Sequence, residues 1–286
     1  MQVDHQSSSA DAFGLRLDGV TSPWPERFSP ESTRRLACRF SDDLPTHLDA
    51  WWLRQEGDAL VVGWRDYAEY RVDAAARSID VSVGAVDVAE ATQGLLLSAL
   101  PLALPLFDLE PLHASAVTVG DLGVVLLGTS GAGKSTLAAG LASLGAQFLS
   151  DDATAIDDAG DILPGPPVGN PRFQDADQLT IGSYNGKVVR LIRHTETTRV
   201  RPGAIVVLSP TPRYPLAIER LAGREVFEAL LGNVRMPWVF KERRQARQLA
   251  IAASLGGLPG ARLRFDPACE DEKQAVEAVL EWTQGL

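Results

Sequence analysis

Residues Leu126–Leu141 read LLGTSGAGKSTLAAGL, and their types and spacing match those of a phosphate-binding loop. The pattern G-x-x-x-x-G-K-[ST] falls on Gly128, Gly133, Lys134 and Ser135. The glycines let the backbone turn tightly, so that successive N–H groups point at phosphate oxygens. The lysine is predicted to reach the β- and γ-phosphates of ATP, and the serine hydroxyl to ligate Mg²⁺. The stretch therefore predicts a nucleoside triphosphate site.

The elements that must position this loop are a strand before it and a helix after it. Gly123–Leu127 is a short apolar run rich in valine and leucine, which is typical of a buried strand. Ser135–Leu144 has leucines at helical spacing, and the amino terminus of such a helix adds its dipole to an anion site. The alternative is a glycine-rich turn that matches the pattern by chance, and the flanking strand and helix argue against it.

Acidic residues follow the next predicted strand along the chain. Ala146–Leu149 is apolar and runs directly into Ser150, Asp151 and Asp152. Carboxylates at the carboxyl end of a strand beside a phosphate loop are placed to hold Mg²⁺ or to take a proton from a nucleophile. Upstream, His113 opens another predicted strand and can orient one of these aspartates. The alternatives are a solvated Asp-Asp turn and a structural histidine.

Composition narrows the class of protein. The 286 residues are 45% apolar, carry a formal net charge of −10 and have a pI of about 4.9. An acidic chain does not attract nucleic acid through its overall field, so no nucleic-acid partner is expected. Cys38 and Cys269 lie far apart and fit no metal or redox spacing, which favours a reducing cytoplasm. The first residues lack a signal-peptide pattern, and the apolar run Leu95–Phe107 is too short to span a bilayer, so a cytoplasmic location without membrane attachment is expected.

The order of predicted elements divides the chain into two parts. Residues 1–110 have short alternating segments, the pattern of a small β-rich α+β domain that ends in a helix at Val86–Leu100 and a proline-punctuated exit. Residues 111–286 alternate strands and helices, so their predicted class is α/β. The adjacent Trp51 and Trp52 are predicted core residues, with a binding platform as the alternative. The predicted strands of the first part are Phe13–Leu17, Ala59–Trp64, Tyr70–Val72 and Ser78–Val83.

The residues around the loop resemble the C-terminal domain of the HPr kinase/phosphorylase family and its HPr-kinase-like relatives. The run HASAV from His113, the loop Gly128–Thr136 and a helix that ends in LASLGAQFLSDD carry the resemblance. It extends more weakly through Leu163–Phe173 and Arg201–Pro210 and covers roughly residues 111–286. Among these relatives, kinases encoded with lasso-peptide biosynthesis are similar in layout, with a β-rich region before the kinase domain. The resemblance implies a P-loop kinase fold of the HPr-kinase and PEP-carboxykinase type.

The same resemblance implies a role for each matching residue. Asp151 matches the general base, His113 the histidine that contacts this base, and Lys134 the lysine that neutralises charge on the transferring phosphoryl group. Asp152 matches the second carboxylate, which with Ser135 would bind Mg²⁺. The implied contacts to ATP are Gly128, Ser130, Gly131, Ala132, Gly133, Lys134, Ser135 and Thr136. The implied partner is a peptide or small protein phosphorylated on serine, which for the lasso-peptide kinases is the precursor's C-terminal serine; a homo-oligomer is left open.

The chain also departs from these relatives. It lacks the segment that bifunctional members carry after the Asp-Asp strand, an acidic residue followed by RG and aliphatics, which puts phosphorolysis and HPr as substrate in doubt. A cationic stretch stands there instead. One interpretation is that it binds a ligand, either the transferring phosphate or an acidic peptide. The other is that its arginines solvate a β-hairpin. Its members are Arg190, Arg193, Arg199 and Arg201. Further on, Trp238–Leu255 predicts an amphipathic helix with Arg243, Arg244 and Arg247 on its polar side.

Three functions of different classes remain open on the sequence. The first is an ATP-dependent kinase that acts on a serine of a peptide or small protein. The second is a small-molecule kinase on the same scaffold, for example one that acts on free serine. The third is a non-catalytic module that binds a partner in response to ATP. A pure binder needs no base beside its nucleotide, so the acidic pair favours the two kinases.

Overall fold

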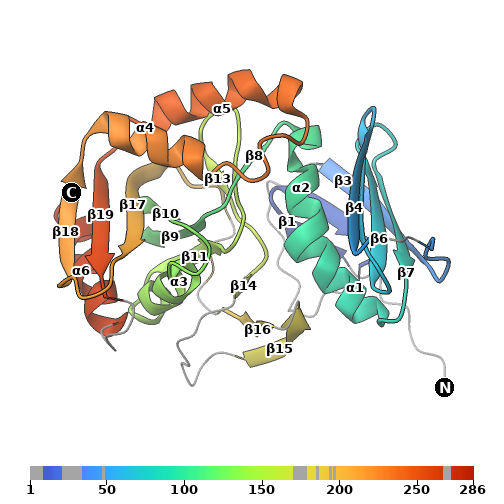
Figure 1. The fold of residues 1–286 in the computed structure, drawn as a ribbon, viewed down its shortest axis with the longest axis horizontal. Coiled ribbons are helices and arrows are strands. Elements are labelled where there is room, and N and C mark those ends of the chain that lie inside the picture. The colour runs from blue at the N-terminus through green and yellow to red at the C-terminus, as the bar shows by residue number, and fades with distance from the viewer. Residues whose placement is uncertain are drawn as a thin grey trace.

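Within the residues that the structure describes, the chain is a mixed α/β protein with strands in four sheets. Figure 1 shows two large sheets, each with helices packed against it. The computed structural model describes the following residues: 9–20, 34–46, 49–169, 179–184, 187–192, 195, 198–266 and 272–286.

The first large sheet has seven strands in the order β1-β2-β3-β7-β6-β5-β4, which leaves β4 at an edge. Its inner face is apolar because residues alternate in their burial, as in β6, where Ala68, Tyr70 and Val72 are buried. The strands are β1 (Ser9–Ala12), β2 (Leu15–Asp18), β3 (Arg34–Ser41), β4 (Trp51–Glu56), β5 (Ala59–Trp64), β6 (Ala68–Asp73) and β7 (Ser78–Val83). The bounds of β5 and β7 confirm the predicted ones.

Two sequence predictions in this sheet are partly wrong. Trp52 is buried and its Nε1 donates a hydrogen bond to Glu69 at 2.6 Å, whereas Trp51 is 48% exposed. The core prediction therefore holds for Trp52 alone, because adjacent residues of a strand face opposite sides. The strand predicted at Phe13–Leu17 contains a turn, since Phe13 has a φ of 55° between β1 and β2.

A helical run of 20 residues, Val88–Phe107, packs against the first sheet. It consists of α1 (Val88–Gly94), a π-helical segment (Leu95–Ala99), α2 (Leu100–Ala103) and a 3₁₀ segment (Leu104–Phe107). The exit predicted from Pro101 onward is wrong, because the helical run continues to Phe107, with its two prolines at the starts of α2 and of the 3₁₀ segment. This run, which extends the predicted apolar segment Leu95–Phe107 at its amino-terminal end, is the one helix among the described residues that is long and apolar enough to cross a bilayer, and 78% of its apolar window is buried inside the protein.

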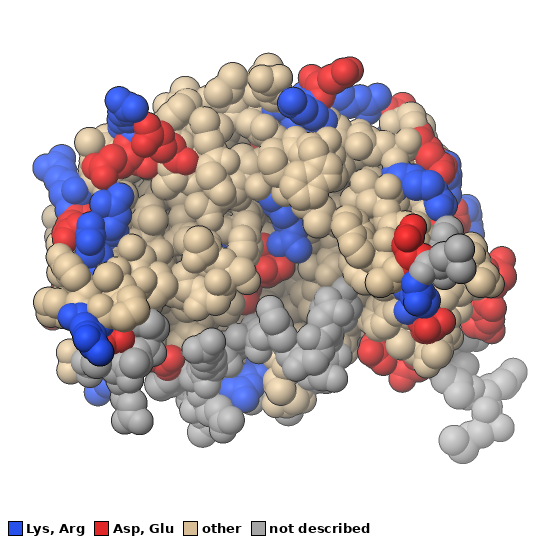
Figure 2. Space-filling view, in the orientation of Figure 1, with Lys and Arg blue, Asp and Glu red and all other residues tan. Residues whose placement is uncertain are grey.

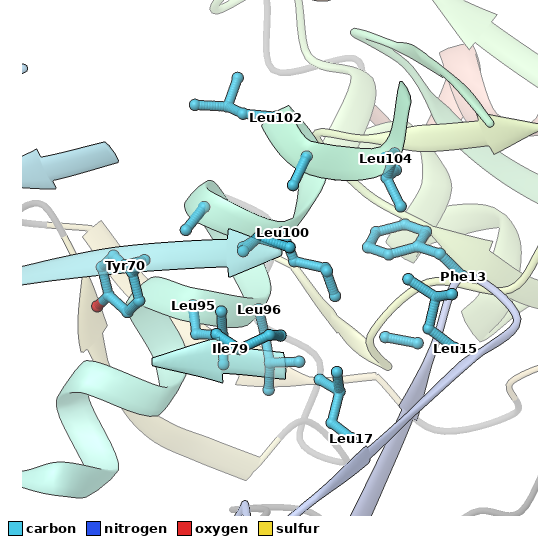
Figure 3. Packing of buried hydrophobic residues seen from close by; sticks show 14 of the residues in the cluster. Phe13, Leu15, Leu17, Tyr70, Ile79, Leu95, Leu96, Leu100, Leu102 and Leu104 are labelled. Atoms are coloured by element: carbon cyan, nitrogen blue, oxygen red, sulfur yellow. The ribbon is translucent and has the colours of Figure 1, made fainter. Parts of the chain in front are cut away.

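The core between the first sheet and the helical run also draws on later parts of the chain. Figure 3 shows Phe13, from the turn between β1 and β2, beside Leu104 of the helical run. The same cluster contains Ala153, Leu163 and Phe240, which lie beyond the boundary predicted at residue 110. The division into residues 1–110 and 111–286 stays a prediction.

The second large sheet has six strands in the order β11-β9-β10-β17-β19-β18. β10, β17 and β19 run parallel to one another, whereas β9 and β18 run antiparallel to their neighbours. The strands are β9 (Ser115–Val119), β10 (Leu122–Leu127), β11 (Gln147–Ser150), β17 (Pro202–Pro210), β18 (Ala217–Leu221) and β19 (Gly260–Phe265).

Four helices cover the two faces of the second sheet (Figure 1): α3 (Lys134–Ser143), α4 (Gly223–Gly232), α5 (Lys241–Leu255) and α6 (Glu272–Gln284). α3 and α6 pack on one face, in a cluster that includes Val124 and Leu126 of β10. α4 and α5 pack on the other face, in a cluster that includes Val125 and Leu127. Successive residues of β10 thus enter two different cores, which explains why this strand is apolar throughout.

Two three-stranded sheets complete the described structure. Their strand orders are β13-β12-β8 and β14-β16-β15. The strands are β8 (Glu110–Leu112), β12 (Thr154–Ile156), β13 (Ile162–Leu163), β14 (Val168–Gly169), β15 (Leu179–Tyr184) and β16 (Lys187–Leu191).

Candidate active site

The topology of the second sheet brings the predicted site residues to one edge. β10 and β11 both run antiparallel to β9, so they point in the same direction. The glycine loop after β10 and the Asp151–Asp152 pair after β11 therefore leave the sheet at the same edge. β9 begins at this edge with Ser115, which is paired in register with Leu126, and His113 precedes it by two residues. The three segments that the sequence singles out thus meet in space.

The loop after β10 has the backbone conformation that its glycines permit. Gly128, Gly131 and Gly133 have φ values of 152°, 81° and 94°, in a region that side chains rarely adopt. A Cβ on Gly128 would lie 3.0 Å from the carbonyl oxygen of Leu208 and 3.2 Å from the Cβ of Ala132. The loop therefore has no room for a side chain at this position.

Lys134 lies at the start of α3, where the positive end of the helix dipole faces the loop. Its side chain is buried, and Nζ donates hydrogen bonds to the carbonyl oxygens of Gly128 at 2.8 Å and Thr129 at 3.2 Å. The ammonium charge is therefore held at the mouth of the cradle. The other predicted nucleotide contacts differ in exposure: Ser130 and Gly131 are exposed, Gly133 and Ser135 are half-buried, and Ala132 and Thr136 are buried.

His113 lies between the loop lysine and the acidic pair. Its Nε2 is 3.4 Å from Lys134 Nζ and 3.5 Å from Asp152 Oδ1. An ammonium group only donates, so Nε2 accepts from Lys134 when it carries no proton and pairs with Asp152 when it does. The family resemblance implied a contact between His113 and the general base, which it matched to Asp151. The contact that the structure records is with Asp152.

Asp152 is held by Arg235 and His113 in an uncommon backbone conformation. Its φ of 61° lies in the left-handed region, which few residues other than glycine, asparagine and aspartate adopt. Arg235 Nη1 donates to the Asp152 carbonyl oxygen at 2.7 Å and to Oδ2 at 2.8 Å. Partial burial raises the pKa of Asp152, but the hydrogen bond with His113 and the charge of Arg235 lower it by more, so this pKa lies below its ordinary value. The side chain is nevertheless 56% exposed, so an ionised carboxylate faces solvent here.

Asp151 has different surroundings from Asp152. It is half-buried, and its Oδ1 accepts a hydrogen bond from the Ser115 hydroxyl at 2.5 Å. Its Oδ2 lies against β14, where a Cβ on Gly169 would come within 2.9 Å of it. Because Gly169 has no side chain, the Asp151 carboxylate has room to lie against β14.

Sequence reasoning missed two residues of the site, Asn233 and Arg235. An isolated bridge lays the segment after α4 alongside Leu112 of β8. The Asn233 backbone oxygen accepts from the backbone N–H of His113 at 2.7 Å, and its side-chain oxygen accepts from the N–H of Gly128 at 3.2 Å. Asn233 thus ties the histidine to the start of the glycine loop. The short irregular stretch NVRMPW before the helix predicted from Trp238 was the only signal in the sequence for either residue.

A buried arginine of α5 holds the turn that carries Arg235. Arg244 is 1% exposed and donates to the carbonyl oxygens of Arg235, Met236 and Val239. It also forms an ion pair with Glu110, which is fully buried in β8. The prediction that Arg244 lies on the polar side of its helix is therefore wrong. It is a structural residue that positions a part of the site.

The structure records ion pairs for part of the predicted cationic stretch. Two of its arginines pair with aspartates of the hairpin between β12 and β13: Arg199 with Asp157 at 3.2 Å and Arg201 with Asp161 at 3.1 Å. Arg190 is half-buried in β16, and Arg193 lies outside the described residues. These ion pairs support the reading of Arg199 and Arg201 as residues that solvate a hairpin.

The described residues contain no group of three or more histidine, cysteine, aspartate or glutamate side chains that could hold a metal ion. Mg²⁺ at nucleotide sites typically uses one or two protein ligands and takes its remaining ligands from phosphates and water. The Ser135 hydroxyl at the start of α3, with one carboxylate from the end of β11, fits that smaller set. Asp152, as the second ligand, would have to share its carboxylate with Arg235 and His113. The metal assignment stays a prediction.

The fold and this site define a mixed α/β protein with a glycine-rich loop beside an acidic pair. No protein-family model matches the chain, and no curated protein matches its sequence. Among solved structures, it is similar to the HPr(Ser) kinase/phosphatase from Coxiella burnetii, with 11% sequence identity and a TM-score of 0.33 over 61% of this chain and 96% of that one. No activity can be inferred from a similarity this low, so the proposed function is argued from the geometry of the site.

Proposed function

We propose that the chain is an ATP-dependent phosphotransferase with a P-loop kinase domain, and that it phosphorylates a serine hydroxyl of a peptide or small protein. One observation carries the proposal: a buried lysine in a glycine cradle, a histidine beside it and two aspartates at the end of the neighbouring strand converge at one edge of the sheet. Binding of a nucleotide alone requires the cradle and the lysine. The carboxylates add the groups that a transfer to a hydroxyl requires.

Each residue has a distinct part in this reaction. Lys134 and the N–H groups of the loop bind the β- and γ-phosphates, and Mg²⁺, when bound, neutralises charge on the phosphate oxygens. Asp151 accepts the proton of the serine hydroxyl, whose oxygen forms a bond to the γ-phosphorus. The bond between this phosphorus and the bridging oxygen breaks, and ADP leaves with the electron pair.

The surroundings of Asp152 support this order of roles. A general base must bind a proton during the reaction, and a carboxylate whose pKa is lowered by cationic neighbours does so poorly. A hydrogen bond with His113 and the charge of Arg235 lower the pKa of Asp152. The Ser115 hydroxyl donates a hydrogen bond to Asp151. We therefore assign proton transfer to Asp151 and the binding of metal or phosphate to Asp152.

The open form of the site supports a polymeric acceptor. Asp152 is 56% exposed, and Figure 2 shows charged side chains of both signs in a hollow between the two halves of this face. An open hollow admits a chain segment, whereas a free amino acid is usually enclosed by its site. The specific acceptor that we propose is the C-terminal serine of a precursor peptide, as for the lasso-peptide kinases that the sequence resembles.

Transfer of label from γ-labelled ATP tests this proposal. We expect the protein to label a peptide that ends in serine and to leave the same peptide with a terminal alanine unlabelled. Lys134→Ala is expected to lose transfer and to bind ATP more weakly. Free serine and HPr serve as competing acceptors. Label on free serine alone would refute the peptide acceptor, and ATP binding without transfer to any acceptor would favour a nucleotide-responsive binding module.

A further inference from the structure

One edge of the first sheet is open to solvent. β4 pairs with β5 alone, and most of its six residues are exposed, whereas the strand at the opposite edge, β1, is almost fully buried. Proteins usually guard an open strand edge with lysine, proline or a bulge, because an unguarded edge pairs with other strands. β4 has none of these: it reads WWLRQE, and its register with β5 is continuous. The edge is therefore available to an extended chain.

The backbone groups of β4 that point to this edge belong to Trp51, Leu53 and Gln55. The backbone N–H of Arg65 donates to the carbonyl oxygen of Ala50 at 3.0 Å, so these two residues form a hydrogen-bonded pair of the ladder between β4 and β5. In an antiparallel ladder such pairs alternate with pairs that are not hydrogen-bonded, and Trp51, Leu53 and Gln55 fall on the second kind. Their N–H and C=O groups point away from β5 and have no backbone partner among the described residues.

Two exposed tryptophans lie at the two ends of this edge. Trp51 begins β4 and is 48% exposed, and Trp238 is 58% exposed. Trp238 and Phe240 line a pocket of about 400 Å³, to which Gln55 and Gly57 contribute from the end of β4. Tryptophan is enriched among the residues that carry most of the binding energy of protein interfaces. The edge thus has an aromatic anchor point at each end.

We infer that β4 binds an extended segment of the acceptor peptide as an additional strand, with one large side chain of this segment in the pocket beside Trp238 and another against Trp51. The inference rests on the proposed function, because it assumes that the acceptor is a peptide. In such a complex the backbone hydrogen bonds give affinity for any extended chain, and the side chains at alternate positions give the choice of sequence. The expected ligand is a segment with an apolar residue at every second position.

A short segment of chain joins this edge to the acidic pair. Gln55 Oε1 accepts a hydrogen bond from the backbone N–H of Phe240 at 2.9 Å, and Arg235 donates to Asp152 at 2.8 Å. The chain from Arg235 to Phe240, together with the two side chains, spans at most about 35 Å. A peptide extends about 3.3 Å per residue, so a linker of about fifteen residues reaches Asp152 from either end of β4. One acceptor chain can therefore occupy the edge and the site together.

A second copy of the chain is the other occupant that an open edge can take. Each copy carries a formal net charge of −10, so two copies repel each other. β4 brings no compensating charge to such a contact, because Arg54 pairs with Glu56 at 3.5 Å and with Glu69 at 3.4 Å. The charge of the protein thus favours the acceptor over a second copy.

Binding of a synthetic peptide tests the docking strand without relying on catalysis. The probe is a segment of phenylalanine, glutamine, valine, glutamine and phenylalanine, followed by a linker of about fifteen glycine and asparagine residues and a terminal serine. The control peptide has the linker and the serine alone. Fluorescence anisotropy of labelled peptides measures binding, and transfer from γ-labelled ATP gives KM. We expect the probe to bind the parent and Lys134→Ala equally, and to have a KM at least about tenfold below that of the control peptide, with a similar kcat.

Two methylated probes distinguish strand pairing from a nonspecific apolar contact. One carries N-methyl groups on the glutamines, and the other carries them on the phenylalanines and the valine. Only one of the two is expected to bind, because alternate N–H groups of a strand face its partner.

Two variants of the edge and one control complete the test. Leu53→Pro removes an N–H that points to the open edge and keeps the ladder with β5, since proline is tolerated in edge strands. Trp51→Ala removes one anchor, and Leu249→Ala removes an apolar side chain of similar exposure, 46%, from α5. We expect both edge variants to weaken binding of the probe about tenfold or more and to leave KM for the control peptide unchanged. Leu249→Ala is expected to behave like the parent.

Each contrary outcome has its own consequence. Equal binding of the probe by the parent and the edge variants, or of the two methylated probes, would overturn the docking strand and leave the proposed function standing. A parent that is dimeric in light scattering and becomes monomeric in Leu53→Pro would assign the edge to a second copy and also overturn the inference. Binding of the probe without transfer to any peptide would overturn the proposed function, and with it the identity of the bound segment as an acceptor. Trp51→Ala keeps the test decisive if Leu53→Pro fails to fold.

Discussion

Replacing Glu110 with glutamine tests how the arginine segment of the site is held in place. The guanidinium group of Arg244 has five N–H donors, and all of them have acceptors. Its Nε and Nη2 bond to Glu110, with the Nε contact at 3.2 Å. The remaining donors bond to the carbonyl oxygens of Arg235 at 3.0 Å, Met236 at 2.8 Å and Val239 at 2.9 Å. Glu110 is therefore the only recorded counter-charge of a fully bonded buried cation.

The expected magnitude follows from the burial of this pair. Glu110 is 0% exposed and Arg244 is 1% exposed, so water cannot replace the lost partner. Glutamine removes the negative charge and turns one acceptor into a donor that faces other donors. Leaving a buried charge unpaired reduces the free energy of unfolding by about 3–5 kcal/mol. For a chain of this size we expect the melting temperature to fall by about 5–20 °C.

The assay compares the melting temperature and the free energy of unfolding in urea of Glu110→Gln with those of a control variant, Glu228→Gln. The control makes the same chemical change at an exposed pair, in which Glu228 accepts from Arg224 at 2.8 Å, and it is expected to change stability little. The double variant Glu110→Leu/Arg244→Met is expected to recover part of the lost stability, because it no longer buries an unpaired charge. The recovery is expected to be incomplete, because three carbonyl oxygens lose their donor. Equal melting temperatures for Glu110→Gln and the control would refute the reasoning.

Three further predictions concern the site itself. Gly169→Ala brings a Cβ within 2.9 Å of Asp151 Oδ2, so we expect kcat to fall by roughly 10- to 100-fold while ATP affinity stays within error; an unchanged kcat would count against the placement of this carboxylate. Gly128→Ala brings a Cβ within 3.0 Å of a β17 carbonyl oxygen, and calorimetry is expected to show loss of ATP binding; retained binding would contradict the cradle. Because the pKa of Asp152 is lowered in the folded state, its contribution to stability is present above about pH 4 and is lost as the pH falls further. The stability difference between the parent and Asp152→Asn is therefore expected to shrink from pH 5 to pH 3, and a constant difference would argue against the pairing with Arg235.

Local sequence signals were enough to predict the loop and the elements beside it. Glycine spacing and the apolar runs on either side specify strand, turn and helix within about twenty residues, and β10 and α3 lie within one residue of the predicted bounds. The strand β11 and the acidic pair at its end follow in the same way. All of these elements depend on contacts close in sequence, which a pattern reports well.

The missed parts of the site depend on contacts between distant segments. Arg235 approaches Asp152 from 83 residues further along the chain, and no local pattern predicts that approach. In the sequence, Arg244 has the pattern of an exposed residue of an amphipathic helix. Its burial could not be predicted from that pattern, because the partner that makes burial possible, Glu110, lies 134 residues away. The separation of Trp51 from Trp52, by contrast, was predictable, since neighbouring residues in a strand must face opposite sides.

The central claim is that Asp151 takes the proton of an acceptor serine while the glycine loop holds ATP. Single-turnover transfer from γ-labelled ATP to a serine-terminated peptide, measured with the parent, Asp151→Asn and Asp152→Asn, tests it most directly. We expect Asp151→Asn to bind ATP like the parent and to transfer phosphate about 10²- to 10⁴-fold more slowly, and Asp152→Asn to require more Mg²⁺. Transfer by Asp151→Asn at the parent rate, with the loss appearing only in Asp152→Asn, would contradict this assignment.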